Sequence, residues 1–103
     1  MRKDDKNELI RIFNYMNRVD EIKMRLEKTL APEQLEIVDD SHLHRGHAGS
    51  ASGAGHFSVV IVSGKFTGMN MVQRHRLVYQ AVGDMMPAEI HALGIRALAP
   101  GEI

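Results

Sequence analysis

The sequence predicts an α+β fold in which helices pack on one face of a small mixed sheet. Two kinds of pattern support this prediction. Apolar residues recur at spacings of three and four in two segments, and polar and apolar residues alternate in three others. The elements follow in the order helix, strand, strand, helix, strand. A chain of 103 residues is long enough for one domain with one modest core.

The first predicted helix covers residues 18–30. It lies within an apolar stripe that begins earlier, so one long helix or two shorter ones both fit: Leu9, Ile12, Phe13, Met16, Val19, Ile22, Leu26 and Leu30. Pro32 ends the helix, because the residue before a proline is also biased away from helical geometry. Asn17 is placed to cap its start. Residues 1–17 therefore form an N-terminal extension, either helical or mobile, ahead of a main domain at 18–103.

Three segments alternate polar and apolar residues and are predicted to be strands: 34–40, 56–63 and 90–98. The first two are joined by a loop, which favours an antiparallel pair. Simple alternation in the last strand places four side chains on one face: His91, Leu93, Ile95 and Ala97.

The second predicted helix covers residues 70–85, and Pro87 ends it at the latest. Its stripe comprises Met71, His75, Val78, Val82 and Met85. When the two helices pack on the sheet, the expected core contains Leu26, Ile37, Val59, Ile61, Val78, Val82 and Leu93.

Composition excludes several classes of protein. Thirteen basic residues balance thirteen acidic residues, which is unlike a protein attracted strongly to nucleic acid or anionic membrane. The longest strongly apolar run, Val59–Val62, is too short to cross a bilayer. No secretory signal is visible at the start, so a soluble cytoplasmic protein with no membrane partner is expected. No nucleophile–base pair stands out, and we expect no enzyme.

Four of the six histidines lie in a segment rich in glycine and serine: His42, His44, His47 and His56. Residues 42–55 are expected to be a mobile loop, whereas His56 directly precedes a strand and is interpreted as structural. The chain has no cysteine, so disulfides and thiolate ligands are excluded and imidazoles are the candidate metal ligands. A zinc site within the loop would lack a rigid scaffold.

Four segments, in this order, resemble the BolA family: "LEIVDDSH", "GHFSVVIVSGKFTG", "RHRLVYQAV" and "IHALGIRAL". The resemblance covers residues 18–100 and leaves the N-terminal extension largely outside. It implies a class II KH-like fold with α-β-β-α-β order. It also implies a role in transcriptional regulation, morphology and stress responses.

The same resemblance implies a partner and a cofactor. Such proteins bind a monothiol glutaredoxin, with its glutathione, and share a [2Fe-2S] cluster with it in iron–sulfur handling or iron regulation. The strand ligand corresponds to His91 and the loop ligand to His47, with His44 and His42 as competitors. Histidines can replace two thiolates on one iron of such a cluster. Without a thiolate of its own, the isolated chain is expected to hold no cluster and to be a monomer or weak dimer.

The alternative function is a DNA-binding transcriptional regulator that uses the KH-like fold. The candidate surface for a partner or nucleic acid comprises Lys65, Arg74, His75 and Arg76. The "GKFTG" stretch has three residues between Gly64 and Gly68, so the GXXG loop of nucleic-acid-binding KH modules is absent. The balanced net charge also weakens this alternative.

Overall fold

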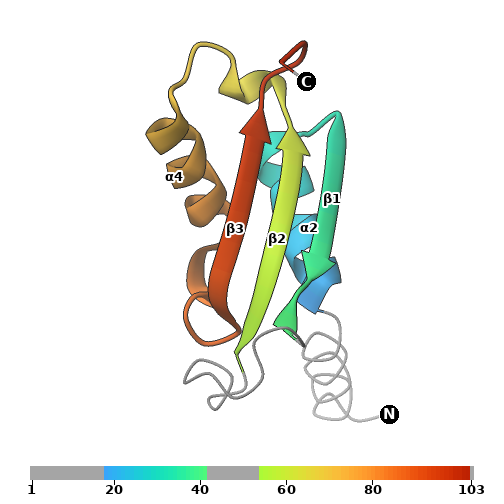
Figure 1. Cartoon of the computed structure of the whole chain (residues 1–103), viewed down its shortest axis with the longest axis vertical. Helices are drawn as coiled ribbons and strands as arrows, with labels where there is room; N and C mark the ends of the chain where they lie inside the picture. The colour runs from blue at the N-terminus through green and yellow to red at the C-terminus, as the bar shows by residue number, and fades with distance from the viewer. Residues whose placement is uncertain (1–17, 42–53, 103) are drawn as a thin grey trace, which may run out of the picture.

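The computed structural model describes residues 18–41 and 54–102, and it confirms the α+β prediction. The helices and strands are α2 (Arg18–Leu30), β1 (Gln34–Asp39), β2 (Gly55–Val62), α4 (Met71–Val82) and β3 (Ile90–Leu98). Short 3₁₀ helices follow β2 and α4, at Gly64–Phe66 and Gly83–Met85. Both α-helices lie behind one face of the sheet (Figure 1). The predicted cap Asn17 and the extension at 1–17 lie outside the described residues.

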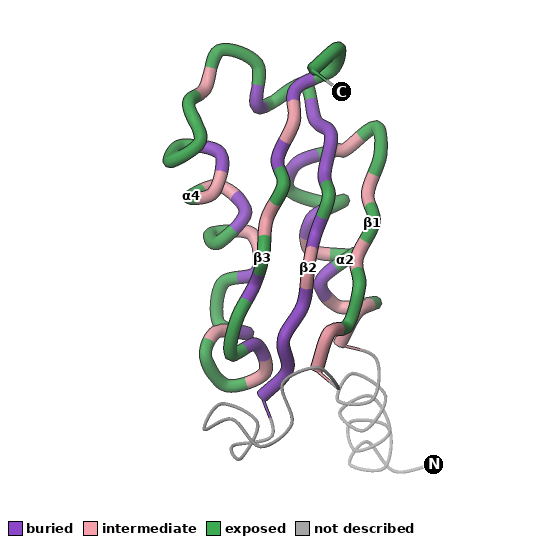
Figure 2. The backbone as a smooth tube through the Cα atoms, viewed as in Figure 1, coloured by how far each residue is buried: buried purple, intermediate pink, exposed green. Residues whose placement is uncertain are grey.

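The sheet has the strand order β1–β2–β3 and is mixed, as predicted. β1 pairs with β2 in antiparallel orientation, and β2 pairs with β3 in parallel orientation. The parallel pair requires a crossover, which α4 and its flanking segments provide. β2 is therefore the central strand, and it is buried along most of its length (Figure 2).

The sheet extends further into the expected loop than the sequence indicated. Gly55 belongs to β2, and its N–H donates to the carbonyl of Glu89 at 3.0 Å. Ala54 is buried beside it. The prediction of a mobile loop is therefore wrong for these two residues, because they are held at the end of the sheet, and the rest of that loop, 42–53, lies outside the described residues.

Helix α4 has well-defined ends. Asn70 and Gln73 form a capping box, in which each side chain accepts a bond from the other residue's backbone N–H. The predicted helix at 70–85 is too long at its end: Gly83 has a φ of 51° and the chain continues as a 3₁₀ turn. Arg25 of α2 donates to the Val82 carbonyl at 2.7 Å, which satisfies one terminal carbonyl of α4 and ties the two helices together.

The core lies between the helices and the sheet. Six of the seven predicted core residues are buried: Leu26, Val59, Ile61, Val78, Val82 and Leu93. Ile37 is only half-buried, because it lies on the edge strand β1. Phe66, in the turn after β2, is fully buried and was not expected in the core. No helix within the two described stretches is both long and apolar enough to span a membrane.

Candidate functional site

The β2–β3 ladder is irregular at the start of β3. Gly55 pairs with Ile90 and His56 pairs with Ala92, so His91 has no residue opposite it. This is a β-bulge, in which one extra residue changes the alternation of faces along the strand. As a result, the side chains of Ile90 and Leu93 are both buried although they lie three positions apart, and His91 is exposed.

The bulge corrects the predicted orientation of His91. Leu93 and Ala97 share the buried face as expected, but His91 does not join them. Its ring instead lies beside that of His56, with ring centroids 5.1 Å apart and planes inclined at 49°. His56 is buried, with 8% of its surface exposed. The fold thus places one buried and one exposed imidazole side by side on adjacent strands.

The backbone of His56 is held by hydrogen bonds to the two residues that follow β1. Its carbonyl accepts a bond from the Asp40 N–H at 2.7 Å, and its N–H donates to the Ser41 hydroxyl at 3.1 Å. The Ser58 hydroxyl donates to the Asp40 carboxylate, and the Ser41 N–H donates to the Asp39 carboxylate at 2.9 Å. These bonds join the end of β1 to the start of β2, and they fix the backbone of His56.

The candidate loop ligands His42, His44 and His47 lie outside the described residues. Ser41, the last described residue before them, bonds to the N–H of His56, so the chain leaves the sheet next to the histidine pair. Within 18–41 and 54–102 there is no group of three or more side chains arranged to hold a metal ion. The described residues can therefore supply at most part of a metal centre at this position.

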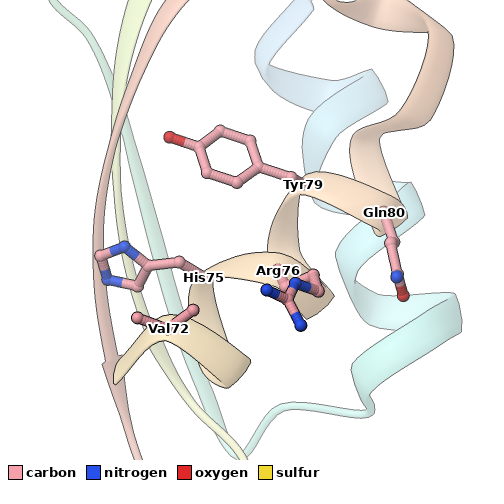
Figure 3. A pocket seen from close by; sticks show the side chains of 5 residues that line it. All are labelled: Val72, His75, Arg76, Tyr79 and Gln80. Atoms are coloured by element: carbon pink, nitrogen blue, oxygen red, sulfur yellow. The ribbon is translucent and has the colours of Figure 1, made fainter. Parts of the chain in front are cut away.

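A second surface feature lies on α4. Val72, His75, Arg76, Tyr79 and Gln80 line a shallow groove of about 480 Å³. Figure 3 shows His75 and Tyr79 projecting to the same side of the helix. Val72 and Tyr79 are exposed. His75 is half-buried, which agrees with its predicted place in the apolar stripe, whereas Met71, also predicted to belong to that stripe, is exposed because it is the first residue of α4. Lys65 is exposed on the turn after β2 and does not line this groove.

Arg74 is not part of an accessible surface, which corrects its place among the candidate partner residues. Its guanidinium donates to the carbonyls of Met69 and Ala97 at 2.9 and 3.0 Å. It also makes a bidentate hydrogen-bonded ion pair with the Glu102 carboxylate, at 2.5 and 2.9 Å. These hydrogen bonds from Arg74, with one from the Ala99 N–H, lower the pKa of Glu102 to about 2. The role of Arg74 is to join α4, β3 and the segment after β3.

These elements define a small α+β domain with two helices on one face of a mixed sheet and a histidine at a bulge in its last strand. The family comparison agrees with this class, since the model described as BolA-like protein matches residues 26–102. The chain belongs to the BolA family.

Related proteins match over most of this chain. Protein BOLA1, chloroplastic, from Arabidopsis thaliana is 43% identical over 84% of this chain and 56% of its own length. BolA-like protein 1 from Mus musculus is 42% identical over 79% of this chain and 57% of its own length. The chain therefore spans little more than half the length of these two curated relatives. Among solved structures, the BolA domain of SufE1 from Arabidopsis thaliana is 40% identical, with a TM-score of 0.75 over 84% of this chain and 96% of that one.

Proposed function

We propose that this protein is an adaptor that binds a monothiol glutaredoxin and contributes imidazole ligands to a [2Fe-2S] cluster shared between the two proteins. The observation that supports this most is the position of His91. The bulge turns this histidine out of the core and leaves it exposed at the end of a strand. An exposed imidazole on a sheet can reach a metal held by another protein, and its position is fixed more closely than that of a loop residue.

The ligand chemistry of the chain fits this proposal. Histidines can replace cysteines on one iron of a [2Fe-2S] cluster, and the chain has histidines but no cysteine. The thiolate ligands must then come from the glutaredoxin and its glutathione. In this proposal the chain itself does no chemistry: it binds, orients its imidazoles and recognises the partner.

The proposal also covers the cellular process, the oligomeric state and the location of the protein. The adaptor acts in iron–sulfur handling or iron and stress regulation, and without its partner it is a monomer or weak dimer. We place it in the cytoplasm, although one relative from Arabidopsis thaliana is named as a chloroplastic protein and another as a chloroplastic or mitochondrial protein. Fractionation of the source cells, with detection of this chain in each fraction, tests that placement.

The substitution His91→Ala tests the adaptor function. The variant and the native chain are each mixed with cluster-loaded glutaredoxin, and the visible absorption and circular dichroism of the cluster are recorded. Loss or strong weakening of the heterocomplex spectrum is expected, and binding to native chain should weaken as pH falls because only neutral imidazole binds metal. Thr29→Ala, a substitution at an exposed position of α2 outside the candidate partner surface, is the control. A wild-type spectrum and cluster stability in His91→Ala would exclude His91 as a ligand.

A DNA-binding regulator is the second candidate function. A relative from Haemophilus influenzae, 38% identical over 79% of this chain and 76% of its own length, is named DNA-binding transcriptional regulator BolA. Lys65 and Arg76 are the candidate cations that are exposed, since Arg74 is engaged internally. A salt-dependent mobility shift of duplex DNA, reduced in Arg76→Ala, would support this function. No shift at low salt would count against it.

A further inference from the structure

We propose that the open face of the sheet, the face turned away from the two helices, is the surface on which two copies of this chain form a weak, reversible dimer about a two-fold axis. Both α-helices lie behind the sheet, and no element within residues 18–41 and 54–102 covers its front (Figure 1). The adaptor function proposed above is compatible with a monomer or a weak dimer and does not depend on this surface.

The open face has an apolar centre between two opposite charges. Val38 of β1 and Val60 of β2 are exposed on it, because side chains alternate along a strand and Ile61, next to Val60, points into the core. The strand pairing places Val60 between Glu36 of β1 and Arg96 of β3, and both of these residues are exposed. One row across the sheet therefore reads acid, valine, base.

The charges of this row distinguish the two ways in which aligned sheets can pair face to face about a two-fold axis. An axis perpendicular to the strands places each strand over its own copy, so that Glu36 faces Glu36 and like charges repel. An axis parallel to the strands places β1 of one copy over β3 of the other. Glu36 then faces Arg96 twice, with Val60 against Val60 between the two pairs. This second arrangement is self-complementary in charge.

The neighbouring row makes the same arrangement complementary in shape. Val38 pairs with Ser58 of β2, and Ser58 pairs with Gly94 of β3. A Cβ at Gly94 would meet other atoms only at ordinary contact distances, the nearest being Oγ of Ser58 at 3.6 Å, so there is space above this glycine. The axis parallel to the strands brings Val38 of one copy over Gly94 of the other. A side chain thus meets a hollow, as the interdigitation of two packed sheets requires.

The size of the open face sets the strength of the dimer. Three strands at ~4.8 Å spacing and eight residues at ~3.3 Å per residue give roughly 380 Å² in each copy. Stable interfaces bury about 800 Å² in each partner. We therefore expect a dissociation constant of roughly 0.1–1 mM, and a dimer that weakens as salt screens the charged row.

Charge reversal in the full chain tests the surface and its symmetry together. Sedimentation equilibrium at low salt, up to about 1 mM protein, measures self-association of the native chain and of two variants, Glu36→Arg and Arg96→Glu. Each variant should weaken self-association at least about tenfold, because like charges then face each other twice. An equimolar mixture of the two variants should associate as the native chain does, because every facing pair is again opposite in charge. Recovery in the mixture also shows that both variants are folded.

Two substitutions of exposed apolar residues complete the experiment. Val60→Lys should remove self-association, since it places two cations against each other at the centre of the open face. Met24→Lys is the matched control, because Met24 is exposed on α2, outside the open face, and the native association should persist.

Three results would overturn the proposal. The first is a native chain that remains monomeric at about 1 mM and low salt. The second is native association in Val60→Lys, or a loss in Met24→Lys equal to that in Val60→Lys. The third is a mixture of Glu36→Arg and Arg96→Glu that associates no better than either variant alone, which would exclude the axis parallel to the strands.

Discussion

Gly55 lies at the point where the core, the bulge and the histidine pair meet, and its replacement by alanine should disturb all three. A Cβ at this position would lie 2.6 Å from Cε2 and 2.8 Å from Cζ of Phe57, and 2.9 Å from Oγ of Ser41. Phe57 is 3% exposed and packs in the core, so its ring has little room to move. Ser41 cannot yield without weakening its bond to the His56 N–H.

Overpacking of this kind costs about 1–3 kcal/mol, and the lower backbone entropy of alanine in the unfolded chain offsets ~0.4–1 kcal/mol. We expect Gly55→Ala to reduce the free energy of unfolding by about 1–2 kcal/mol, which corresponds to a fall in Tm of roughly 4–16 °C for a domain of this size. Urea and thermal unfolding measure the change.

Gly64→Ala is the matched control for this prediction. A Cβ at Gly64 would meet no atom within 4 Å, so the same substitution there should be neutral or slightly stabilising. Equal free energies of unfolding in the two variants would show that the close approach of Gly55 to Phe57 and Ser41 has no energetic consequence, and the reasoning would fail.

Two further predictions concern stability. The hydrogen bonds from Arg74 lower the pKa of Glu102 to about 2 from its ordinary value of 4.5, so their stabilisation is complete above the ordinary value and is lost as pH falls toward the lower one. Glu102→Gln should therefore lower the free energy of unfolding at neutral pH. In urea titrations this loss relative to the native chain should shrink as pH falls from 4.5 to 2. A loss that does not depend on pH would contradict the prediction. The buried Ser63 hydroxyl donates to the Leu30 carbonyl at 2.6 Å, so Ser63→Ala should cost about 1–3 kcal/mol in urea unfolding, while the exposed Thr29→Ala should cost nothing.

Local patterns in the sequence were sufficient to predict the helices and strands and their order. Pro32 follows closely after the end of α2, and apolar spacing identified the stripe of each helix. The strands were recognised by alternation, and their predicted bounds differ from the observed bounds by one residue or less at each end. These features are local because capping, proline geometry and side-chain periodicity depend on residues close together in the chain.

The bulge at His91 could not be predicted in the same way. "IHALGIRAL" alternates without interruption when read alone, and the irregularity arises only from how β3 pairs with Gly55 and His56 of β2. For the same reason His56 was interpreted as structural: its neighbour His91 is 35 positions away in the numbering. The relative position of the two histidines is a property of two strands together.

The burial of Arg74 and Phe66 also depends on distant contacts. Arg74 was taken for a surface cation because its partner Glu102 lies 28 residues further along the chain. Phe66 lies between two glycines in a turn, where apolar residues are usually exposed, and the core it enters is built from other segments. Neither position carries a local signal of burial.

Arg74 has a consequence for how copies of this protein behave toward each other. β3 is an edge strand; its Leu98 carbonyl points inward to the Ser63 N–H, so the Ala97 carbonyl points outward from the sheet. An outward row of backbone groups on an apolar edge strand invites a foreign strand to pair and so promotes aggregation. Arg74 occupies the Ala97 carbonyl with its guanidinium. The same contact that holds the end of the fold together thus blocks one position at which a misfolded neighbour could extend the sheet.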